Sequence, residues 1–297
     1  MHESFLPLVK FALSEDVGTG DVTTLNAVPA NIGARAAIVA KQPGVVSGMD
    51  IAGMTFREID ATVKFKSTVK DGQEVPAGAA LATVSGSAAS IMTAERTALN
   101  FLMRLSGVAT LTRAYVNAIA GTGAVILDTR KTTPGLRILE KYAVLCGGGQ
   151  NHRLALWDMY LVKDNHIRAA RGLTNAIDRI QRTRRDLLLE VEVESIDQLH
   201  EALRPEVDRI LIDNQTPAVV KRCVEQVDRW FEKNPPDHPR FRDGARRWPE
   251  VEVSGGLNLK NIRAYAETGA DYLSVGALTH SAPALDLGLD FAIAGAR

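Results

Sequence analysis

The sequence predicts an α/β protein with two unlike parts, a small sheet domain followed by a parallel β/α barrel. Over roughly the first hundred residues, short alternating apolar and polar runs are separated by Pro-Gly, Asp-Gly and Ala-Gly turns, the pattern of a mostly antiparallel sheet. From Ala124 the pattern becomes strand, loop and helix, repeated, which is typical of parallel strands joined by right-handed crossovers. No GxGxxG sequence follows the first of these strands, so a closed or nearly closed barrel is favoured over a dinucleotide-binding sheet.

The expected barrel strands share a short apolar run that ends in polar or glycine residues. They are AVILD (124–128), MYLVKD (159–164), LLLEVEVE (187–194), DRILIDN (208–214), VEVSGG (251–256) and DYLSVGA (271–277). The helices expected between them cover 169–185, 195–204, 216–233 and 258–269, and two earlier helices are expected over 88–105 and on to 119. The segment 232–250, with four prolines and several arginines, interrupts the pattern and is expected to be a solvated surface insertion.

The composition limits the class of protein. The chain has 297 residues, of which 45% are hydrophobic and 24% charged, as in a globular protein with a large core. Basic and acidic residues number 35 each, so the net charge attracts the chain neither to nucleic acid nor to a membrane. No apolar run reaches the roughly 18 residues of a membrane span, the N-terminus does not have the pattern of a signal peptide, and the two cysteines make no disulfide framework. We therefore expect a cytoplasmic protein.

Polar side chains end almost every expected barrel strand. In a β/α barrel the chemistry lies at the carboxyl ends of the strands, where the βα loops emerge. A ring of such residues around one barrel mouth is hard to explain as scaffold alone. They are Asp128, Lys163, Glu192 with Glu194, Asp213, Ser254 and Gly276.

The segment LLLEVEVES predicts carboxylates inside the barrel. Residues alternate between the faces of a strand, so Glu190, Glu192 and Glu194 share one side, and the apolar side must meet the outer helices. Unpaired buried carboxylates cost several kcal/mol each, so they need cations. The available partners are Arg130, Lys131, Arg153 and Lys163. The alternative is a buried ion network with no function.

Two glycine-bearing turns near the end of the barrel favour phosphate. SGGLNLKNI places Ser254 and two glycines before a helix that Asn258 would cap, and free N–H groups at a helix start attract anions. SVGALT supplies Gly276 one unit later, and barrels commonly bind phosphate with the loops after their last two strands. The alternative is an ordinary tight βα turn.

Arg96 lies on a helix with two apolar faces. Met92, Leu99 and Met103 form the second stripe, and Arg96 lies within it. A helix with two apolar faces has two packing partners, so the arginine indicates a subunit or domain contact near an anion. An arginine whose methylenes cover the core is the equally supported alternative.

These segments together resemble the quinolinate phosphoribosyltransferase family. The matching segments are EDVGTGDVTT, ERTALNFLMRLSGVAT, DTRKTTPGLR, KYAVLCGGGQNHR, LVKDNH, EVEVE, DN, SGG and VGALTHS, in the family's order and over nearly the whole chain. The resemblance implies an N-terminal open sandwich over 1–110, with 280–297 packing back on it, and an incomplete parallel β/α barrel over 111–279. The insertion at 232–250 is the main departure and touches no matched segment.

The resemblance also implies a reaction. Quinolinate and 5-phosphoribosyl-1-pyrophosphate would give nicotinate mononucleotide, pyrophosphate and CO₂ with Mg²⁺, in NAD biosynthesis. It further implies a homodimer in which the N-terminal domain of one subunit covers the barrel mouth of the other, while assembly beyond the dimer stays open. A paralogous phosphoribosyltransferase with another acceptor, a Schiff-base aldolase using Lys163 and a non-catalytic anion sensor are the alternatives.

Residue roles follow from the same resemblance. Lys163, Glu192 and Asp213 are the implied catalytic residues, and the two carboxylates are also the implied Mg²⁺ ligands, largely through substrate and water. Arg96 would reach the partner's site. The implied substrate-binding residues are Arg96, Thr129, Arg130, Lys131, His152, Arg153, Lys163, Glu192, Asp213, Ser254, Gly255, Gly256, Val275, Gly276 and Ala277.

Overall fold

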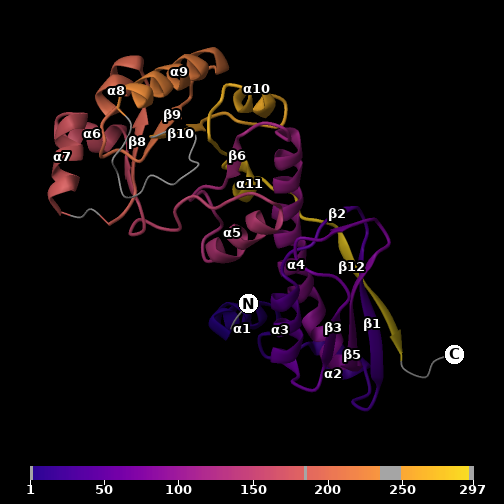
Figure 1. Cartoon of the computed structure of the whole chain (residues 1–297). Helices are drawn as coiled ribbons and strands as arrows, with labels where there is room; N and C mark the ends of the chain where they lie inside the picture. Colours follow the sequence, from indigo (N-terminus) through magenta and orange to yellow (C-terminus); the bar gives the residue numbers. More distant parts are fainter. Residues whose placement is uncertain (1–2, 184–185, 235–248, 294–297) are drawn as a thin grey trace. The chain divides into compact units, whose positions relative to one another are not determined.

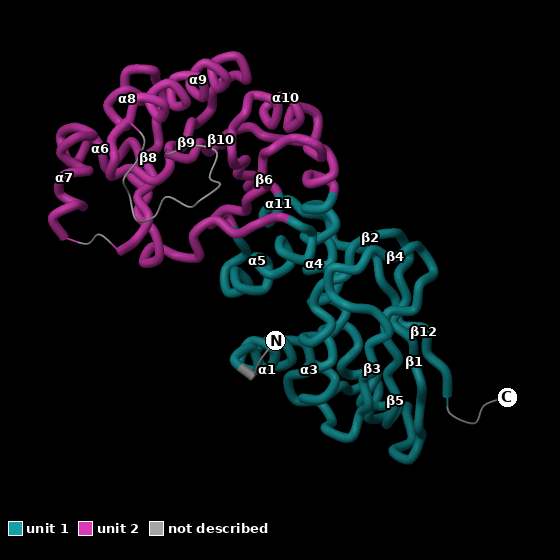
Figure 2. Tube along the Cα trace, viewed as in Figure 1, with its two compact units in different colours: residues 1–113, 132–148, 278–297 teal, residues 114–131, 149–277 magenta. Residues whose placement is uncertain are grey.

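The computed structural model describes residues 3–183, 186–234 and 249–293, which form two compact units (Figure 2). Unit 1 consists of 1–113, 132–148 and 278–297, and unit 2 of 114–131 and 149–277. The segment 132–148, which we expected in the barrel, clusters with unit 1 instead. Most of the expected insertion, residues 235–248, lies outside the described residues.

Unit 1 is built on a four-stranded antiparallel sheet in the order β12-β1-β5-β3, with a separate β2–β4 pair (Figure 1). Its strands are β1 (Gly33–Ala40), β2 (Gly44–Val45), β3 (Lys64–Ser67), β4 (Glu74–Val75), β5 (Ala80–Ser87) and β12 (Leu287–Ile293). Its helices are the 3-10 turn Glu3–Phe5, α1 (Leu6–Val17), α2 (Val22–Ala27), α3 (Met49–Ile59), most of α4 (Ala88–Ala118), α5 (Arg137–Cys146) and nearly all of α11 (Ala277–His280). The expected antiparallel character of the first part of the chain is confirmed.

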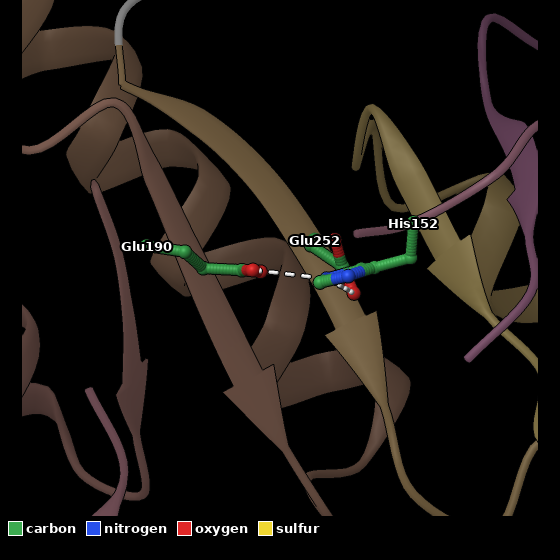
Figure 3. A group of neighbouring side chains, drawn as sticks. All are labelled: His152, Glu190 and Glu252. Carbon is green, nitrogen blue, oxygen red and sulfur yellow. Dashed lines mark hydrogen bonds and ion pairs between the residues drawn. The ribbon is translucent and has the colours of Figure 1, made fainter. Parts of the chain in front are cut away.

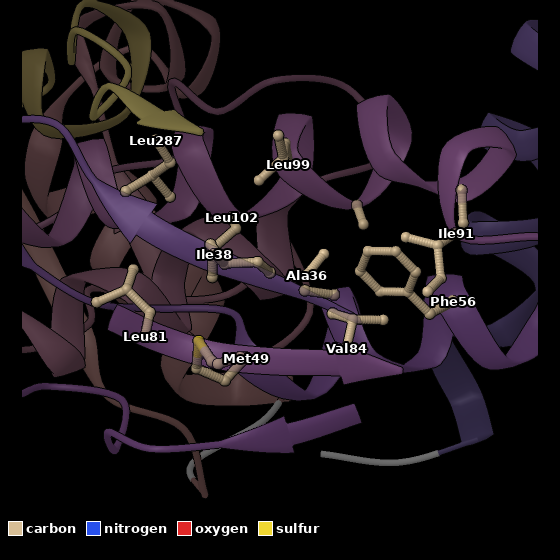
Figure 4. Packing of buried hydrophobic residues seen from close by; sticks show 14 of the residues in the cluster. Ala36, Ile38, Met49, Phe56, Leu81, Val84, Ile91, Leu99, Leu102 and Leu287 are labelled. Atoms are coloured by element: carbon tan, nitrogen blue, oxygen red, sulfur yellow. The ribbon is translucent and has the colours of Figure 1, made fainter. Parts of the chain in front are cut away.

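The core of unit 1 lies between this sheet and helices α3 and α4 (Figure 4). Alternate residues of β1, among them Ala36 and Ile38, are buried, as the period of two along a strand requires. They pack with Phe56 of α3 and with Ile91 and Leu99 of α4, which are all fully buried. Burying such large side chains contributes roughly 1.5–3 kcal/mol each.

Helix α4 is one continuous helix of 31 residues, not the two shorter helices that we expected. Glycine usually weakens a helix interior, yet Gly107 lies in the middle of α4. A Cβ added at Gly107 would lie 2.1 Å from the carbonyl oxygen of Pro283 and 3.0 Å from Cα of Ala284. The missing side chain therefore lets the C-terminal segment of unit 1 pack directly on the helix.

Unit 2 contains the expected six strands, all parallel, in the order β6-β11-β10-β9-β8-β7. They are β6 (Val125–Leu127), β7 (Tyr160–Val162), β8 (Leu189–Val193), β9 (Arg209–Asp213), β10 (Glu250–Ser254) and β11 (Tyr272–Ser274). Strands β6 and β7 are the two edges of the sheet, and a single bridge from Leu127 to Gln150 extends the β6 side. The parallel sheet is thus incomplete as a barrel.

The helices of unit 2 are α6 (Asp164–Ala170), α7 (Leu173–Thr183), α8 (Ile196–Ala202), α9 (Pro217–Lys233) and α10 (Ile262–Ala266). In α9 the buried residues Val220, Cys223, Val224 and Val227 follow the spacing of a helix with one apolar face. The helix expected over 169–185 is instead two helices, which separate at Gly172 with φ +136°. In the described part of the chain, no helix is long and apolar enough to span a membrane.

Gly107→Ala should destabilise unit 1, because the new methyl group would collide with the backbone at Pro283. Alanine is the better helix former by about 1 kcal/mol, so a loss of stability would report the collision alone. We expect the free energy of unfolding to fall by about 1–3 kcal/mol in urea titrations. Asn100→Ala, at an exposed position of the same helix, is the control and should not be destabilised. An unchanged midpoint for Gly107→Ala would contradict the packing described here.

Candidate active site

The carboxyl ends of the six strands lie along one edge of the unit 2 sheet. Parallel pairing places Ser254 of β10 beside Asp213 of β9, and Ser274 of β11 beside Leu127 of β6. The loops that follow these strands therefore emerge together. This is the edge at which β/α barrels bind substrate.

Asp128, directly after β6, binds the segment that follows Gln150 at this edge of the sheet. Its carboxylate is fully buried and accepts hydrogen bonds from Nδ2 of Asn151 at 2.6 Å and from the backbone N–H of His152 at 2.9 Å. Such charge-assisted bonds are stronger than neutral ones. Asp128 thus fixes the backbone that carries His152 and Arg153.

The imidazole of His152 points into the barrel between two glutamates (Figure 3). Its Nε2 lies 2.9 Å from Glu190 of β8 and 3.4 Å from Glu252 of β10, and its Nδ1 accepts the backbone N–H of Arg153 at 2.7 Å. Because Nδ1 is an acceptor, Nε2 carries the proton and donates it to Glu190. Both ring nitrogens of His152, a residue that the resemblance assigns to substrate binding, are therefore engaged within the protein.

Two influences act on the protonation of His152. Burial would lower its pKa, but the negative charges of Glu252 and Glu190 outweigh burial and raise it. A second proton on the ring would turn Nδ1 into a donor facing the N–H of Arg153. The two carboxylates therefore favour a second proton on the ring, whereas the hydrogen bond from the Arg153 N–H opposes it.

Arg209 of β9 balances the buried carboxylates. Its guanidinium donates to Glu252 at 3.1 Å and to Glu250 at 2.9 Å, and it lies 4.0 Å from the centre of the Tyr272 ring. Burial would lower the pKa of Arg209, but the surrounding glutamates raise it further, so the side chain stays charged. Glu252 also accepts the hydroxyl of Ser274 at 2.5 Å.

The pKa values of Glu190 and Glu252 are shifted in opposite directions. Burial would raise the pKa of both, but the hydrogen bond from His152 and the charge of Arg209 lower that of Glu190. Burial and repulsion by Glu190 raise the pKa of Glu252 to about 7. Near neutral pH, Glu252 is therefore partly protonated, while Oε1 of Glu190 is buried and has no hydrogen-bond partner among the described residues.

Arg130 and Arg153 bring two guanidinium groups together outside this network. Burial and repulsion by Arg130 lower the pKa of Arg153, whose Nη1 donates to the carbonyl of Met159 at 3.1 Å. Nε of Arg130 is buried and, among the described residues, donates to no acceptor. Two like charges with an unused donor form a receptor for an anion, and the guanidinium shape suits a carboxylate.

Lys163 and Glu192 form an ion pair at the ends of β7 and β8. Lys163 follows the last residue of β7, and Glu192 is 8% exposed on β8. The prediction that Glu190, Glu192 and Glu194 all face the barrel was wrong for Glu194, which lies past the end of β8 and is exposed. Glu192 thus pairs with Lys163, one of the predicted cations. Glu190 instead accepts a hydrogen bond from His152 and is stabilised by the charge of Arg209.

A hydroxyl, a carboxylate and two glycines lie at the ends of β9 and β10. Ser254 donates its hydroxyl to Asp213, whose other oxygen accepts from Asn214 at 2.5 Å. Gly255 and Gly256 have φ of +91° and +65°, and a Cβ on Gly255 would lie 2.1 Å from Oδ1 of Asn214. In the described chain, neither glycine N–H donates to a protein acceptor, so both are available to an anion.

The helix expected to be capped by Asn258 does not start there. Asn258 instead accepts the N–H of Lys260 at 3.0 Å in a local turn, and α10 begins at Ile262. The anion-binding argument therefore rests on the glycine N–H groups and not on a helix start.

Comparison with known proteins places the chain in a family. Models described as quinolinate phosphoribosyl transferase, C-terminal domain, and quinolinate phosphoribosyl transferase, N-terminal domain, match residues 108–290 and 21–106. This chain belongs to the quinolinate phosphoribosyltransferase family. The expected family, fold class and enzyme class, a pentosyltransferase, are thereby confirmed.

Relatives of this phosphoribosyltransferase extend over almost its whole length. It is 42% identical over 289 residues to the nicotinate-nucleotide pyrophosphorylase [carboxylating] of Mycobacterium leprae, with 95% of each chain covered. It is 39% identical to the quinolinate phosphoribosyltransferase [decarboxylating] 1b of Nicotiana tabacum, with 95% of this chain and 81% of that protein covered. The solved nicotinate-nucleotide pyrophosphorylase of Ehrlichia chaffeensis superposes with a TM-score of 0.88 at 36% identity, covering 98% of this chain and 100% of that one.

The remaining predicted residues of this family member lie as follows. Thr129 accepts the N–H of Lys131 at 3.0 Å, and Lys131 is exposed. Val275, which precedes Gly276 and Ala277, donates its N–H to Leu127 at 2.9 Å, which joins the β11 loop to β6. Arg96 is in unit 1, with its side chain 61% exposed and 4.0 Å from Glu95.

Sequence reasoning missed Arg209, Glu250 and Glu252. The signal was present in EVEVS (250–254), which alternates in the same way as the glutamates of β8. Arg209 was not predicted because it is the first residue of β9. It therefore lies at the amino end of the strand, whereas the chemistry was expected at the carboxyl end.

Two donor sets of the phosphoribosyltransferase could be considered for a metal. His152, Glu190 and Glu252 offer three ligand atoms within 4.8 Å of one another, but Arg209 already supplies the cation there. Glu192 and Asp213 offer carboxylate oxygens at the strand ends, beside the glycine N–H groups of the next loop. Hard oxygen donors, few in number, fit Mg²⁺ held mainly by water and substrate.

Glu252→Gln should remove one component of the pH dependence of stability. The pKa of Glu252 is raised from an ordinary 4.5 to about 7, so between these values the folded protein keeps a proton that the unfolded chain releases. The stability contributed by this group is fully present below pH 4.5 and is lost as the pH rises through 7. The wild type should therefore lose about 3 kcal/mol relative to Glu252→Gln over this interval.

Urea unfolding at a series of pH values from 4.5 to 8 measures this difference. Glu267→Gln, at an exposed ion pair with Arg263, is the control and should follow the wild type. A constant difference between wild type and Glu252→Gln would contradict the assigned proton.

Proposed function

We propose that this chain transfers the phosphoribosyl group of 5-phosphoribosyl-1-pyrophosphate to quinolinate, with loss of CO₂, giving nicotinate mononucleotide and pyrophosphate in NAD biosynthesis. The observation that carries the proposal is the pairing of Arg130 with Arg153, in which a buried Nε of Arg130 has no acceptor among the described residues. Quinolinate is a dianion, and bidentate guanidinium contacts select carboxylates. The names of the relatives point to the same reaction.

The cations and carboxylates of the site suit different parts of the reaction. Arg130, Arg153 and Lys163 bind the quinolinate carboxylates, while the N–H groups of Gly255 and Gly256 bind phosphate. As pyrophosphate leaves, positive charge develops at C1 of the ribose. Carboxylates fixed in advance stabilise that charge without reorganisation, which is the role proposed for Glu192 and Asp213.

Glu192 and Asp213 would hold Mg²⁺ through the substrate and water. When bound, the ion offsets charge on the departing pyrophosphate. Decarboxylation then needs little from the protein. The ribosylated ring nitrogen is cationic and stabilises the electron pair left at C2 as CO₂ departs, and a proton taken up from the solvent replaces CO₂ at C2. The residues orient the ring and keep water from C1 of the ribose during the transfer, and no covalent enzyme intermediate is required.

The aldolase alternative is not favoured by the structure. Schiff-base chemistry needs a lysine amine that can lose its proton and attack a carbonyl. Nζ of Lys163 is ion-paired with Glu192 and is therefore already engaged. A non-catalytic anion sensor would have little use for the carboxylate pair opposite the cations.

The proposal includes a homodimer of cytoplasmic subunits in which Arg96 of one subunit completes the site of the other. Two observations support this. The Arg96 side chain is 61% exposed on α4 with only a weak contact to Glu95, and its neighbours Thr93 and Thr97 bind Asp21 and Asp16 of the N-terminal segment. The EDVGTGDVTT segment, to which the sequence assigned no role, therefore packs around the helix face that carries Arg96.

CO₂ release from quinolinate in the presence of 5-phosphoribosyl-1-pyrophosphate and Mg²⁺ tests the reaction. Arg130→Ala should lower kcat/KM for quinolinate about 100-fold or more, because a charge-assisted bidentate contact is lost. Arg229→Ala, which removes an exposed arginine of α9, is the matched control and should behave as the wild type. No CO₂ release by the wild type would overturn the proposal.

Subunit mixing tests the shared site. Arg96→Ala and Lys163→Ala should each be inactive alone, whereas a mixed dimer has one barrel with Lys163 that receives Arg96 from its partner. After random exchange of equal amounts, about a quarter of wild-type activity should return, because half of the dimers are mixed and each has one intact site. Verified mixed dimers that stay inactive would exclude the shared site.

A further inference from the structure

The most unusual feature of unit 2 that the reaction does not use directly is the buried group formed by His152, Glu190, Glu252 and Arg209. It comes from the segment after Gln150 and from strands β8, β9 and β10 (Figure 3). Glu190 is 0% exposed and Glu252 1%. Burying such a group is costly, and the same volume could be filled by apolar side chains.

We infer that His152 and Glu190 are positioning residues that aim the Arg153 guanidinium at a substrate carboxylate, through the imidazole that bridges Glu190 and the Arg153 backbone. This inference rests on the proposed function only in taking Arg153 as a ligand of quinolinate. It gives His152 a role different from the direct substrate contact implied by the family resemblance.

The bridge is continuous and directional. Nε2 of His152 donates to Glu190 at 2.9 Å, and Nδ1 accepts the N–H of Arg153 at 2.7 Å. The carbonyl of Met159 holds the other end of Arg153, accepting from Nη1 at 3.1 Å. The backbone and the guanidinium of Arg153 are thus fixed by separate contacts.

The far side of the bridge is anchored by the sheet. Nε2 of His152 also lies 3.4 Å from Glu252, which is held by Arg209 at 3.1 Å and by Ser274 at 2.5 Å. Apart from His152, each of these side chains belongs to a different strand, so none can rotate without breaking a buried polar contact. The orientation of His152 is therefore set by four strands of the sheet and not by its own loop.

The fixed orientation of His152 matters for Arg153, whose charge is repelled by that of Arg130. Arg153 lies near enough to Arg130 for the two charges to repel, so an unsupported Arg153 would turn away when no anion is bound. Because the backbone of Arg153 is already fixed, less conformational entropy is lost when the substrate binds. Displacing a binding group by about 1 Å can cost a factor of 100 in rate.

Binding measurements test the inference without turnover. Isothermal titration of the full-length protein with quinolinate alone, and separately with 5-phosphoribosyl-1-pyrophosphate alone, gives one Kd for each. Glu190→Ala should weaken quinolinate binding tenfold or more and change the second Kd less than twofold. Glu190→Gln, whose Oε1 still accepts from Nε2 of His152, should stay within threefold of the wild type for both.

A double-mutant cycle separates positioning from general disorder. Arg153→Ala weakens quinolinate binding, and Glu190→Ala should add nothing further in that background. Losses that add in full, or equal losses for both substrates, would overturn the inference. Glu201→Gln, which loses an exposed carboxylate of α8 away from the site, is the control.

A second variant covers the case in which Glu190→Ala does not fold. His152→Asn can accept the N–H of Arg153 but is too short to reach Glu190, so it should show the same loss without additivity. Unchanged quinolinate binding by folded His152→Asn would also overturn the inference. Because the test measures substrate binding and not turnover, it would still decide the role of His152 and Glu190 if the wild type released no CO₂.

Discussion

The structure of unit 2 depends on the neutralisation of carboxylates buried inside its sheet. Glu190 of β8 and Glu252 of β10 are buried on either side of β9, where an unpaired charge costs several kcal/mol. Arg209 supplies the charge, His152 supplies a donor, and the raised pKa of Glu252 reduces the remaining repulsion. Because each partner comes from a different segment, the interaction ties three strands and the loop before β7 into one unit.

The same constraint separates the working cations from the structural one. Arg209 is satisfied within the sheet, so it leaves no donor to attract a ligand strongly. Arg130 and Arg153 lie at the strand ends, where their two positive charges repel each other. Nε of Arg130 has no acceptor among the described residues. A barrel can thus hold many charges and still direct its binding energy to a single anionic substrate.

Much of the fold could be predicted because its signals are local. Six strand segments were found from apolar runs that end in polar residues, and all six form strands in the expected parallel sheet. The division of α4 into two helices after Leu105 was wrong, because the helix continues through Gly107. Its position depends on a backbone contact with Pro283, more than 170 residues away in sequence, which no local pattern reports.

The sequence by itself determined the fold class, the family and the residue types that meet at the strand ends, since periodicity and ordered motifs are properties of the chain. It did not determine which charges pair. Glu192 pairs with Lys163, but Glu190 takes His152, and Glu194 leaves the barrel at the end of its strand. Pairing depends on strand order and on side-chain reach across the sheet. Those distances exist only once β8, β9 and β10 lie side by side, because the partners are far apart along the chain.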